Sequence, residues 1–220
     1  MQLDASTYSA GSWIDSVSGL QFVPYGTSST PTYSSSIGGG SFSFDSSKGQ
    51  YMQSTTPLPS MATWSIEVWH LYTGLTAGQY PAIITDIESA SGPNFALSAI
   101  FGTPPAIRVS YVNSAITSWV VSDAITLPTM GIWYQLVATF DGTEVKVYVN
   151  NVLTMTNAMT GTPVSSGVGI RLMRRWDLED YWGGSLGLVR IYNVALTAVE
   201  VRMNWLFSKG RFGFMDLPVS

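Results

Sequence analysis

The stretch Ile132–Asn150, IWYQLVATFDGTEVKVYVN, decides the fold. Apolar and polar residues alternate on both sides of its centre, and alternation with a period of two is typical of half-buried strands. The Asp141-Gly142 pair between the two runs is a strong signal for a tight hairpin turn. We therefore predict two antiparallel strands joined at this pair.

Strand-like runs of the same kind recur along the rest of the chain. In TWSIEVWHLY, Trp64, Ile66 and Val68 alternate with Ser65 and Glu67. Further runs are PAIITDIE, NFALSAIF, AIRVSYV, TSWVVSD, GVGIRLMR and GSLGLVRIY, with turns such as SGPN and GTPP between them. Many short strands at near-regular spacing predict an all-β fold, a two-sheet antiparallel sandwich.

One helix is predicted near the end of the chain. Thr197 and Glu200 have the spacing of a capping box, and Gly210 stands where a helix would terminate. Apolar residues recur between them at helical spacing, at Leu196, Val199, Met203 and Leu206 or Phe207. Such a stripe normally faces a core, so we expect it to seal part of the sandwich core or a sheet edge. With no internal repeat and no clear linker, we predict one domain over residues 1–220.

Charge is sparse over the whole chain. Charged residues make up 11% of the 220 residues, and the net charge is −4, whereas ordinary soluble domains contain about 25% charged residues. The ten Lys and Arg residues are too few for a basic patch that binds a phosphate backbone, so we expect no nucleic-acid partner. Weak repulsion between such surfaces suits assembly into an oligomer. A monomer with a surface rich in Ser and Thr is the open alternative.

Several classes of site and location are excluded or disfavoured. The chain has no cysteine, which excludes disulfides, thiolate metal sites and cysteine nucleophiles. The opening MQLDASTYSAGSW has neither the basic nor the apolar region of a signal peptide, and no window approaches 18 unbroken apolar residues. We therefore expect a protein made in the cytoplasm, without a signal peptide and without a membrane partner.

The segment MRRWDLEDYW, Met173–Trp182, is the best candidate for a binding site. It holds five charged residues, two tryptophans and a tyrosine in a chain otherwise poor in charge. Flat aromatic faces beside hydrogen-bonding charges suit a sugar ring or a protein partner. The candidate residues are Trp176, Asp177, Glu179, Asp180, Tyr181 and Trp182. Two alternatives stay open: the segment is merely a solvated loop, or Trp182 belongs to the last strand and packs inward.

The other aromatic residues divide into two groups. A strand context predicts core or near-core positions for Trp64, Trp133, Tyr148 and Tyr192. Tyr111 and Trp119 are candidates for a second exposed aromatic platform.

Five segments in the same order resemble a concanavalin A-like jelly roll of the laminin-G-like type. They are LDASTYSAGSWIDSVSGLQF, PTYSSSIGGGSFSFD, TWSIEVW, GIWYQLVATFDGTEVKVYVNNV and GGSLGLVRIYNVALTAVEVRMNWLFSKGRFG. The resemblance covers nearly the whole chain and implies two antiparallel sheets packed face to face, with one short C-terminal helix. This fold hosts lectins, glucanases, adhesion modules and virion proteins, so it does not specify an activity.

A finer resemblance is to the version of this domain in structural proteins of tailed phages and large viruses. The LDA start, PTYSSSIGGGSFSFD and the KGRFG tail carry it. It implies a non-enzymatic virion surface protein, either a capsid decoration or a tail-associated component. Its partners would be other virion proteins, further copies of itself and a cell-surface glycan. The alternatives are a lectin-like carbohydrate-binding module and a glucan hydrolase.

The residues give little support for catalysis or for a metal. Glucanases of this fold resemble one another in a strand that places two carboxylates about 5 Å apart, with a third acid nearby. Here Asp86 and Glu88 lack the third acid, while Asp177 and Glu179 fall in a predicted loop. The only histidine, His70, lies in a predicted strand, and no nucleophile elbow surrounds any serine. The chain lacks the three or four ligands that zinc requires. Calcium stays an open alternative at Asp86, Asp177, Glu179 and Asp180, although their spacing resembles no calcium loop. We therefore expect no enzyme, no metal and no cofactor.

Overall fold

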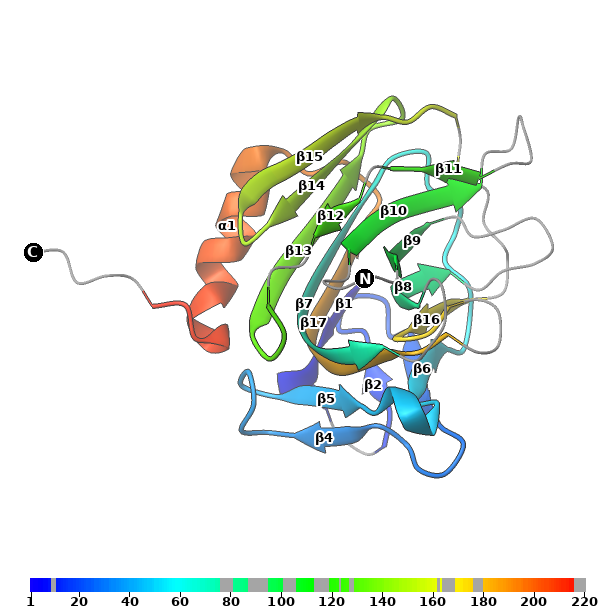
Figure 1. The fold of residues 1–220 in the computed structure, drawn as a ribbon, viewed down its shortest axis with the longest axis vertical. Coiled ribbons are helices and arrows are strands. Elements are labelled where there is room, and N and C mark those ends of the chain that lie inside the picture. Colours follow the sequence, from blue (N-terminus) through cyan, green and yellow to red (C-terminus); the bar gives the residue numbers. More distant parts are fainter. Residues whose placement is uncertain are drawn as a thin grey trace, which may run out of the picture.

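The chain forms a two-layer β-sandwich with a helix on its outer surface (Figure 1). The computed structural model describes all residues except 9–10, 76–80, 87–94, 101–105, 113–118, 123, 127–128, 162, 164–168, 176–179 and 216–220. The predicted all-β sandwich of two antiparallel sheets with one short C-terminal helix is confirmed.

The sheet that carries the helix, here the helix-side sheet, has the order β15-β14-β13-β7-β17-β5-β4, and β1 also pairs with β17. Its strands are β1 (Gln2–Asp4), β4 (Thr32–Ser34), β5 (Ser41–Phe44), β7 (Trp64–Leu75), β13 (Trp133–Phe140), β14 (Glu144–Val149), β15 (Val152–Ala158) and β17 (Trp182–Tyr192). The first strand therefore lies beside the last one, which ties the two ends of the fold together.

The opposite sheet has the order β11-β10-β9-β8-β16-β6-β3-β2, and β12 also pairs with β10. Its strands are β2 (Trp13–Ile14), β3 (Gln21–Tyr25), β6 (Tyr51–Ser54), β8 (Ala82–Asp86), β9 (Ala96–Ile100), β10 (Ala106–Val112), β11 (Trp119–Val121), β12 (Ile125–Thr126) and β16 (Ile170–Leu172). Short 3-10 helices are η1 (Ala5–Thr7), η2 (Ser46–Lys48) and η3 (Lys209–Phe212). The chain crosses between the sheets repeatedly, so each sheet combines early and late strands.

The predicted hairpin is confirmed as β13 and β14. The two strands pair antiparallel from Leu136 opposite Val149 onward. At the turn, the Asp141 carboxylate accepts hydrogen bonds from the backbone N–H groups of Thr143 and Glu144, at 2.8 and 2.9 Å. Gly142 has a φ of 100°, a conformation that glycine adopts without steric cost. The aspartate thus caps the turn with its carboxylate, and the glycine adopts the positive φ that the turn requires.

The main core lies between the two sheets and is strongly aromatic. Trp64 has no exposed surface and packs against Phe140, with ring centroids 5.6 Å apart. Tyr111 is equally buried and lies 5.2 Å from the same ring, so the prediction of an exposed platform at Tyr111 is wrong. The side chain of Trp119 lies outside the described residues. Alternating residues of β10 point inward, and Tyr111 shares the inward parity of Ile107 and Val109.

A second apolar layer lies outside the helix-side sheet. Trp133 contacts Phe212 of η3, at a centroid distance of 4.8 Å, and is half-buried there instead of in the core between the sheets. Trp69 stacks on Phe212 at 4.3 Å. Both faces of the helix-side sheet are therefore covered where the C-terminal segment crosses it.

The capping box predicted the start of helix α1 (Ala198–Ser208) correctly. The Thr197 backbone N–H donates to the Glu200 carboxylate at 2.7 Å, and the Glu200 N–H donates to the Thr197 hydroxyl at 3.3 Å. The helix ends at Ser208, before the predicted terminator Gly210, and the chain continues as η3 until Gly213 reverses it with a φ of 89°. In the part of the chain that the structure describes, no helix has the length and apolarity of a membrane span.

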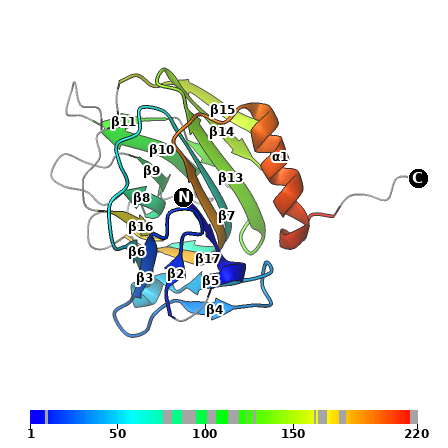
Figure 2. The same ribbon diagram turned by 180° about the vertical axis from the view of Figure 1, so that it is seen from behind.

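The predicted burial of the apolar stripe holds at Leu196, which packs against a buried cluster beneath the helix, but it is wrong for the residues of α1 itself. Val199, Met203 and Phe207 are 70%, 61% and 87% exposed. The opposite side of the helix faces the sheet instead, where Trp205 stacks on Trp69 at 5.2 Å and Val201 is fully buried. Figures 1 and 2 show α1 as the outermost element on this side of the molecule. Contacts with the sheet, and not the helical pattern alone, determine which side of α1 is buried.

Candidate functional site

The candidate segment at 173–182 connects β16 to β17. Arg174 and Tyr181 form a β-bridge at its base. One residue further out, the Arg175 N–H donates to the Asp180 carbonyl at 2.9 Å, and the two side chains form an ion pair at 3.0 Å. Residues 176–179 lie outside the described residues, so the proposed roles of Trp176, Asp177 and Glu179 stay predictions.

The three described candidates have different environments. Trp182 has no exposed surface and packs edge-on against Tyr72 inside the sandwich. Asp180 is buried in its pair with Arg175. Tyr181 is half-buried and lies at the surface. The alternative in which Trp182 packs inward is therefore the one that the structure shows, and Tyr181 is the described aromatic candidate with surface available to a ligand.

Tyr181 belongs to a surface cluster that we call the tyrosine–arginine rim, formed by Tyr25, Tyr51, Tyr181, Arg171 and Arg174. Tyr25, at the end of β3, lies directly opposite Tyr51, at the start of β6, in the strand register. Directly opposed side chains are close enough to interact, and these two rings stack with centroids 4.9 Å apart and an interplanar angle of 11°. Tyr25 remains 41% exposed beyond this stack.

Two guanidinium groups lie against the same rings. Arg174 is placed over Tyr51 at 4.4 Å and over Tyr181 at 5.4 Å, within the range of a cation–π contact. Arg171 lies 5.9 Å from Tyr51 and donates from Nε to Gln53 at 3.2 Å. Burial, together with the neighbouring Arg174, lowers the pKa of Arg171 below its usual value, but an arginine stays charged at neutral pH. The rim therefore combines flat apolar faces with two positioned cations.

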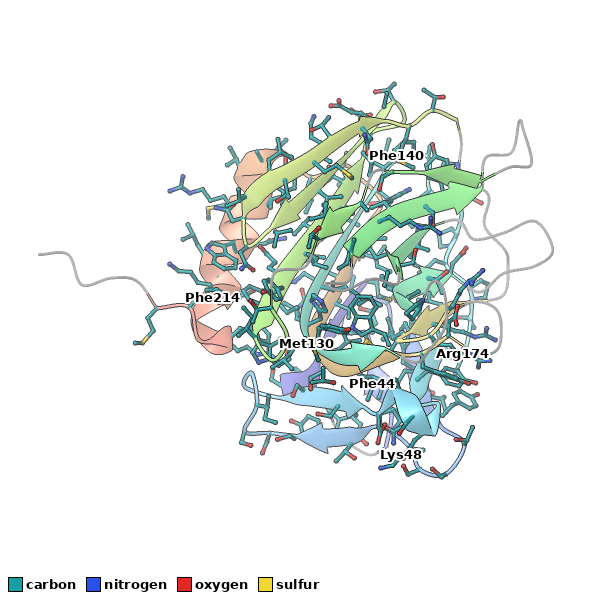
Figure 3. The ribbon with its side chains drawn as sticks, viewed as in Figure 1. Phe44, Lys48, Met130, Phe140, Arg174 and Phe214 are labelled. Atoms are coloured by element: carbon teal, nitrogen blue, oxygen red, sulfur yellow. The ribbon has the colours of Figure 1, made fainter. Side chains whose placement is uncertain are left out.

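The turn after η2 packs against the tyrosine–arginine rim. Gly49 has a φ of 59°, and a Cβ atom there would lie only 3.2 Å from the Tyr181 ring and from Thr27. The Lys48 carbonyl accepts hydrogen bonds from both the N–H and the hydroxyl of Thr27, at 2.9 and 2.8 Å. Figure 3 shows Lys48 and Arg174 at the same end of the molecule. A glycine at this position thus lets Tyr181 approach the backbone closely.

A polar pocket of about 380 Å³ adjoins this turn. Its lining is rich in hydroxyl groups and comprises Ser29, Thr32, Ser43, Phe44, Asp45, Ser46, Lys48, Gln50, Thr73, Gly74 and Gly183. Asp45 and Lys48, which are both partly exposed, form an ion pair at 3.1 Å. Hydroxyl, amide and carboxylate groups of this kind are donors and acceptors suited to sugar hydroxyls.

The candidate catalytic residues are buried or lie outside the described residues. Asp86 is buried at the end of β8, and its partner Glu88 lies outside the described residues, as do Asp177 and Glu179. His70 has no exposed surface and lies between Tyr134 and Trp182, at centroid distances of 6.0 and 5.8 Å. Burial lowers its pKa to about 4, so the imidazole is neutral at pH 7 and shielded from solvent.

The same acidic residues are also the candidates for metal ligands. Among the residues that the structure describes, no group of three or more His, Asp or Glu side chains could hold a metal ion. The described acids near the rim are instead engaged locally, Asp180 with Arg175 and Asp45 with Lys48.

The sequence matches a family model over residues 44–202, and that model describes the concanavalin A-like lectin/glucanases superfamily. No curated protein sequence matches the chain.

Solved structures with the same fold include several binding domains. Domain 4 of AbnA, a GH43 extracellular arabinanase from Geobacillus stearothermophilus in complex with arabinotriose, has a TM-score of 0.71 at 18% identity, covering 91% of this chain and 94% of that one. The botulinum neurotoxin serotype G binding domain has a TM-score of 0.68 at 18% identity, covering 94% of this chain but 50% of that one. A heptameric SAP-like pentraxin from Limulus polyphemus has a TM-score of 0.53 at 17% identity, covering 69% of this chain and 73% of that one. At these identities the likeness shows the fold alone.

Proposed function

Because the chain belongs to the concanavalin A-like lectin/glucanases superfamily, whose fold serves both binding modules and enzymes, we propose that it is a non-enzymatic module that binds an oligosaccharide at the tyrosine–arginine rim. The observation that carries this proposal is the stacked pair of Tyr25 and Tyr51 with Arg174 fixed over the second ring. An aromatic face beside fixed N–H donors is a surface that matches both the apolar and the polar sides of a sugar ring.

The geometry of the rim favours binding with little loss of conformational freedom. One face of Tyr25 lies against Tyr51, and 41% of the residue remains exposed to receive a ligand. Arg174 is 5% exposed and lies over Tyr51 and Tyr181, so it holds these rings in place before a ligand arrives, while the half-buried Arg171 is the cation with surface available to the ligand. Preorganised groups lose less side-chain entropy on binding than mobile ones. The side chains of the rim are thus already ordered in the free protein.

The polar pocket beside η2 extends this surface. Asp45 and Gln50 line the pocket, while Gly49 and Tyr51 of the same segment face the rim. A sugar unit on Tyr25 and Tyr51 would therefore place a neighbouring unit near hydroxyl and carboxylate groups. An oligosaccharide, and not a single sugar, fits this arrangement. Since the arabinanase domain of the same fold holds arabinotriose, short arabinan fragments are sensible first ligands beside a glycan array.

A binding role without catalysis is supported by the burial of His70. The imidazole faces the interior of the sandwich and has no exposed surface. A general base must reach the proton that it removes. The histidine of this chain is therefore unsuited to act on a ligand bound at the rim.

Replacing Tyr25 by alanine is expected to weaken oligosaccharide binding at least tenfold, because it removes the exposed aromatic face. A tenfold change corresponds to about 1.4 kcal/mol, the size of a single stacking contact. Isothermal titration calorimetry with the best ligand from a glycan array measures the change. Val152→Ala is the control, since Val152 is 65% exposed on β15, in the other sheet from β3 and β6. Equal affinities for both variants, or an array without any hit, would refute binding at the rim.

As a second candidate, we propose that this binding module is a virion surface component. Its support is the sparse charge, which suits assembly with other proteins, together with the resemblance to phage and large-virus structural proteins. Mass spectrometry of purified particles is expected to find the chain, bound to a capsid or tail protein. Recovery only from the cytosol of uninfected cells, with no particle, would contradict this role.

A further inference from the structure

We propose that two copies of this chain pair around a two-fold axis through the exposed face of α1. This surface, the α1 outer face, consists of apolar side chains on the helix and at its two ends: Val194 (51% exposed), Val199 (70%), Met203 (61%), Leu206 (47%), Phe207 (87%) and Met215 (88%). Four of these side chains lie on α1 itself, and soluble monomers rarely expose a large apolar patch without a binding role.

The spacing along the helix is that of a packing seam. Val199, Met203 and Leu206 are separated by four and then three residues, so they lie on one stripe of the helix surface. This 4–3 spacing is the one that faces a partner helix in paired helices. The stripe lies opposite the buried side chains of Val201 and Ser208, so it points away from the sheet.

The charges on α1 lie at the margins of this stripe. Arg202 and Glu200 are both exposed and flank Met203 and Val199. The Glu200 carboxylate is engaged by the N–H and hydroxyl of Thr197, at 2.7 and 2.8 Å. The centre of the α1 outer face thus contains no charge that would need desolvation. The charged residues would lie in the polar rim that surrounds the apolar centre of most interfaces.

The available area matches what a dimer requires. A large apolar side chain offers about 60–120 Å² of apolar surface for burial, so six side chains with these exposures provide about 250–500 Å² per copy. A standard interface buries about 800 Å² per partner, of which roughly 57%, or about 450 Å², is apolar. One helix face therefore supplies the apolar centre of an interface of ordinary size.

A second copy is the occupant that these properties favour. An uncharged seam meets an identical seam without like-charge repulsion, as a two-fold interface requires. The net charge of −4 on 220 residues adds little repulsion between whole molecules. Figure 3 places Phe214, which follows η3, on the opposite side of the molecule from Arg174. Pairing through α1 would therefore leave both tyrosine–arginine rims free to bind a multivalent ligand.

The test is the solution mass of the full chain, measured by size-exclusion chromatography with light scattering over a range of concentrations. We expect the wild type to have twice the 23.8 kDa of one chain, and Phe207→Glu and Met203→Glu to have the mass of a monomer. Val17→Glu is the matched control, since Val17 is 74% exposed in the turn between β2 and β3. This control is expected to remain dimeric.

A second measurement locates the interface without a disruptive substitution. Because the chain has no cysteine, Met203→Cys introduces a single thiol at the centre of the seam. Mild oxidation is expected to convert this variant, but not Val17→Cys, into a disulfide-linked dimer. A wild type that stays monomeric at about 100 µM protein, a concentration at which a dimer with a Kd of a few micromolar would form, would overturn the proposal. So would a dimer that persists in both glutamate variants, or a monomer whose α1 outer face binds a different protein.

Discussion

Glu67→Ala is expected to lower the free energy of unfolding by about 3–5 kcal/mol, because it leaves a buried guanidinium without its carboxylate. Glu67 has no exposed surface, and Arg190 is 7% exposed. The Glu67 carboxylate accepts hydrogen bonds from Gln135 Nε2 (2.8 Å), Asn204 Nδ2 (2.8 Å), Arg190 Nη1 (3.2 Å to Oε2) and Trp69 Nε1 (3.3 Å). One side chain therefore satisfies donors from β7, β13, β17 and α1.

The expected loss is large relative to the stability of a domain, which is typically about 5–15 kcal/mol. Chemical denaturation in urea measures it, with the midpoint and slope analysed together. Lys48→Ala is the control, because Lys48 belongs to an exposed ion pair with Asp45, and exposed pairs contribute little. A loss below about 1 kcal/mol for Glu67→Ala would show that water replaces the missing carboxylate.

A double variant distinguishes the ion pair from simple packing. Replacing both Glu67 and Arg190 by methionine removes the two buried charges together. We expect this double variant to be less destabilised than the sum of the two single variants, because neither charge is left alone. Additive losses would indicate that the two side chains act independently, contrary to the 3.2 Å contact between them.

Local signals in the sequence predict part of this fold, whereas contacts between distant residues, such as those of Glu67, cannot be predicted from it. The hairpin at Asp141-Gly142 and the capping box at Thr197 are local signals, and both are confirmed. Glu67 alternates with apolar neighbours, and this pattern predicts that its side chain faces solvent. Its burial depends on Asn204, 137 residues later. For this reason the helix was predicted, but the side of α1 that faces the sheet was not.

The same difference between local signals and contacts across the sheet applies to the candidate site. Tyr181 was found because charged and aromatic residues cluster locally in its segment. Tyr25 and Tyr51 were missed, because they become neighbours only through the pairing of β3 with β6. Trp182 was placed among the binding residues although its parity in β17 directs it inward. Strand pairing and strand parity, which are properties of the folded sheet, therefore separate the predicted site from the observed rim.

Lowering the pH from 7 to 5 is expected to reduce the free energy of unfolding by about 2 kcal/mol, and by about 3 kcal/mol at pH 4, through His70 alone. Burial lowers the pKa of this side chain in the folded protein to about 4, whereas an exposed histidine in the unfolded chain has a pKa of about 6.5. The unfolded chain therefore binds a proton more tightly. Stability is constant above about pH 7, falls between pH 6.5 and 4, and receives no further contribution from His70 below that range.

The single histidine makes this pH effect separable from that of the acidic residues. Asp15, buried at 1% exposure, has a pKa lowered by hydrogen bonds from Gln2, Val17 and Ser18 despite its burial, so its contribution is lost only below about pH 4. Urea denaturation at pH 7, 6 and 5 isolates His70, and the slope is expected to vanish in His70→Gln. If that variant fails to fold, the imidazole resonances of the wild type provide the same test. A signal that titrates near pH 6.5 in the folded protein would mean that His70 is accessible to solvent, and the argument against a catalytic histidine would fail with it.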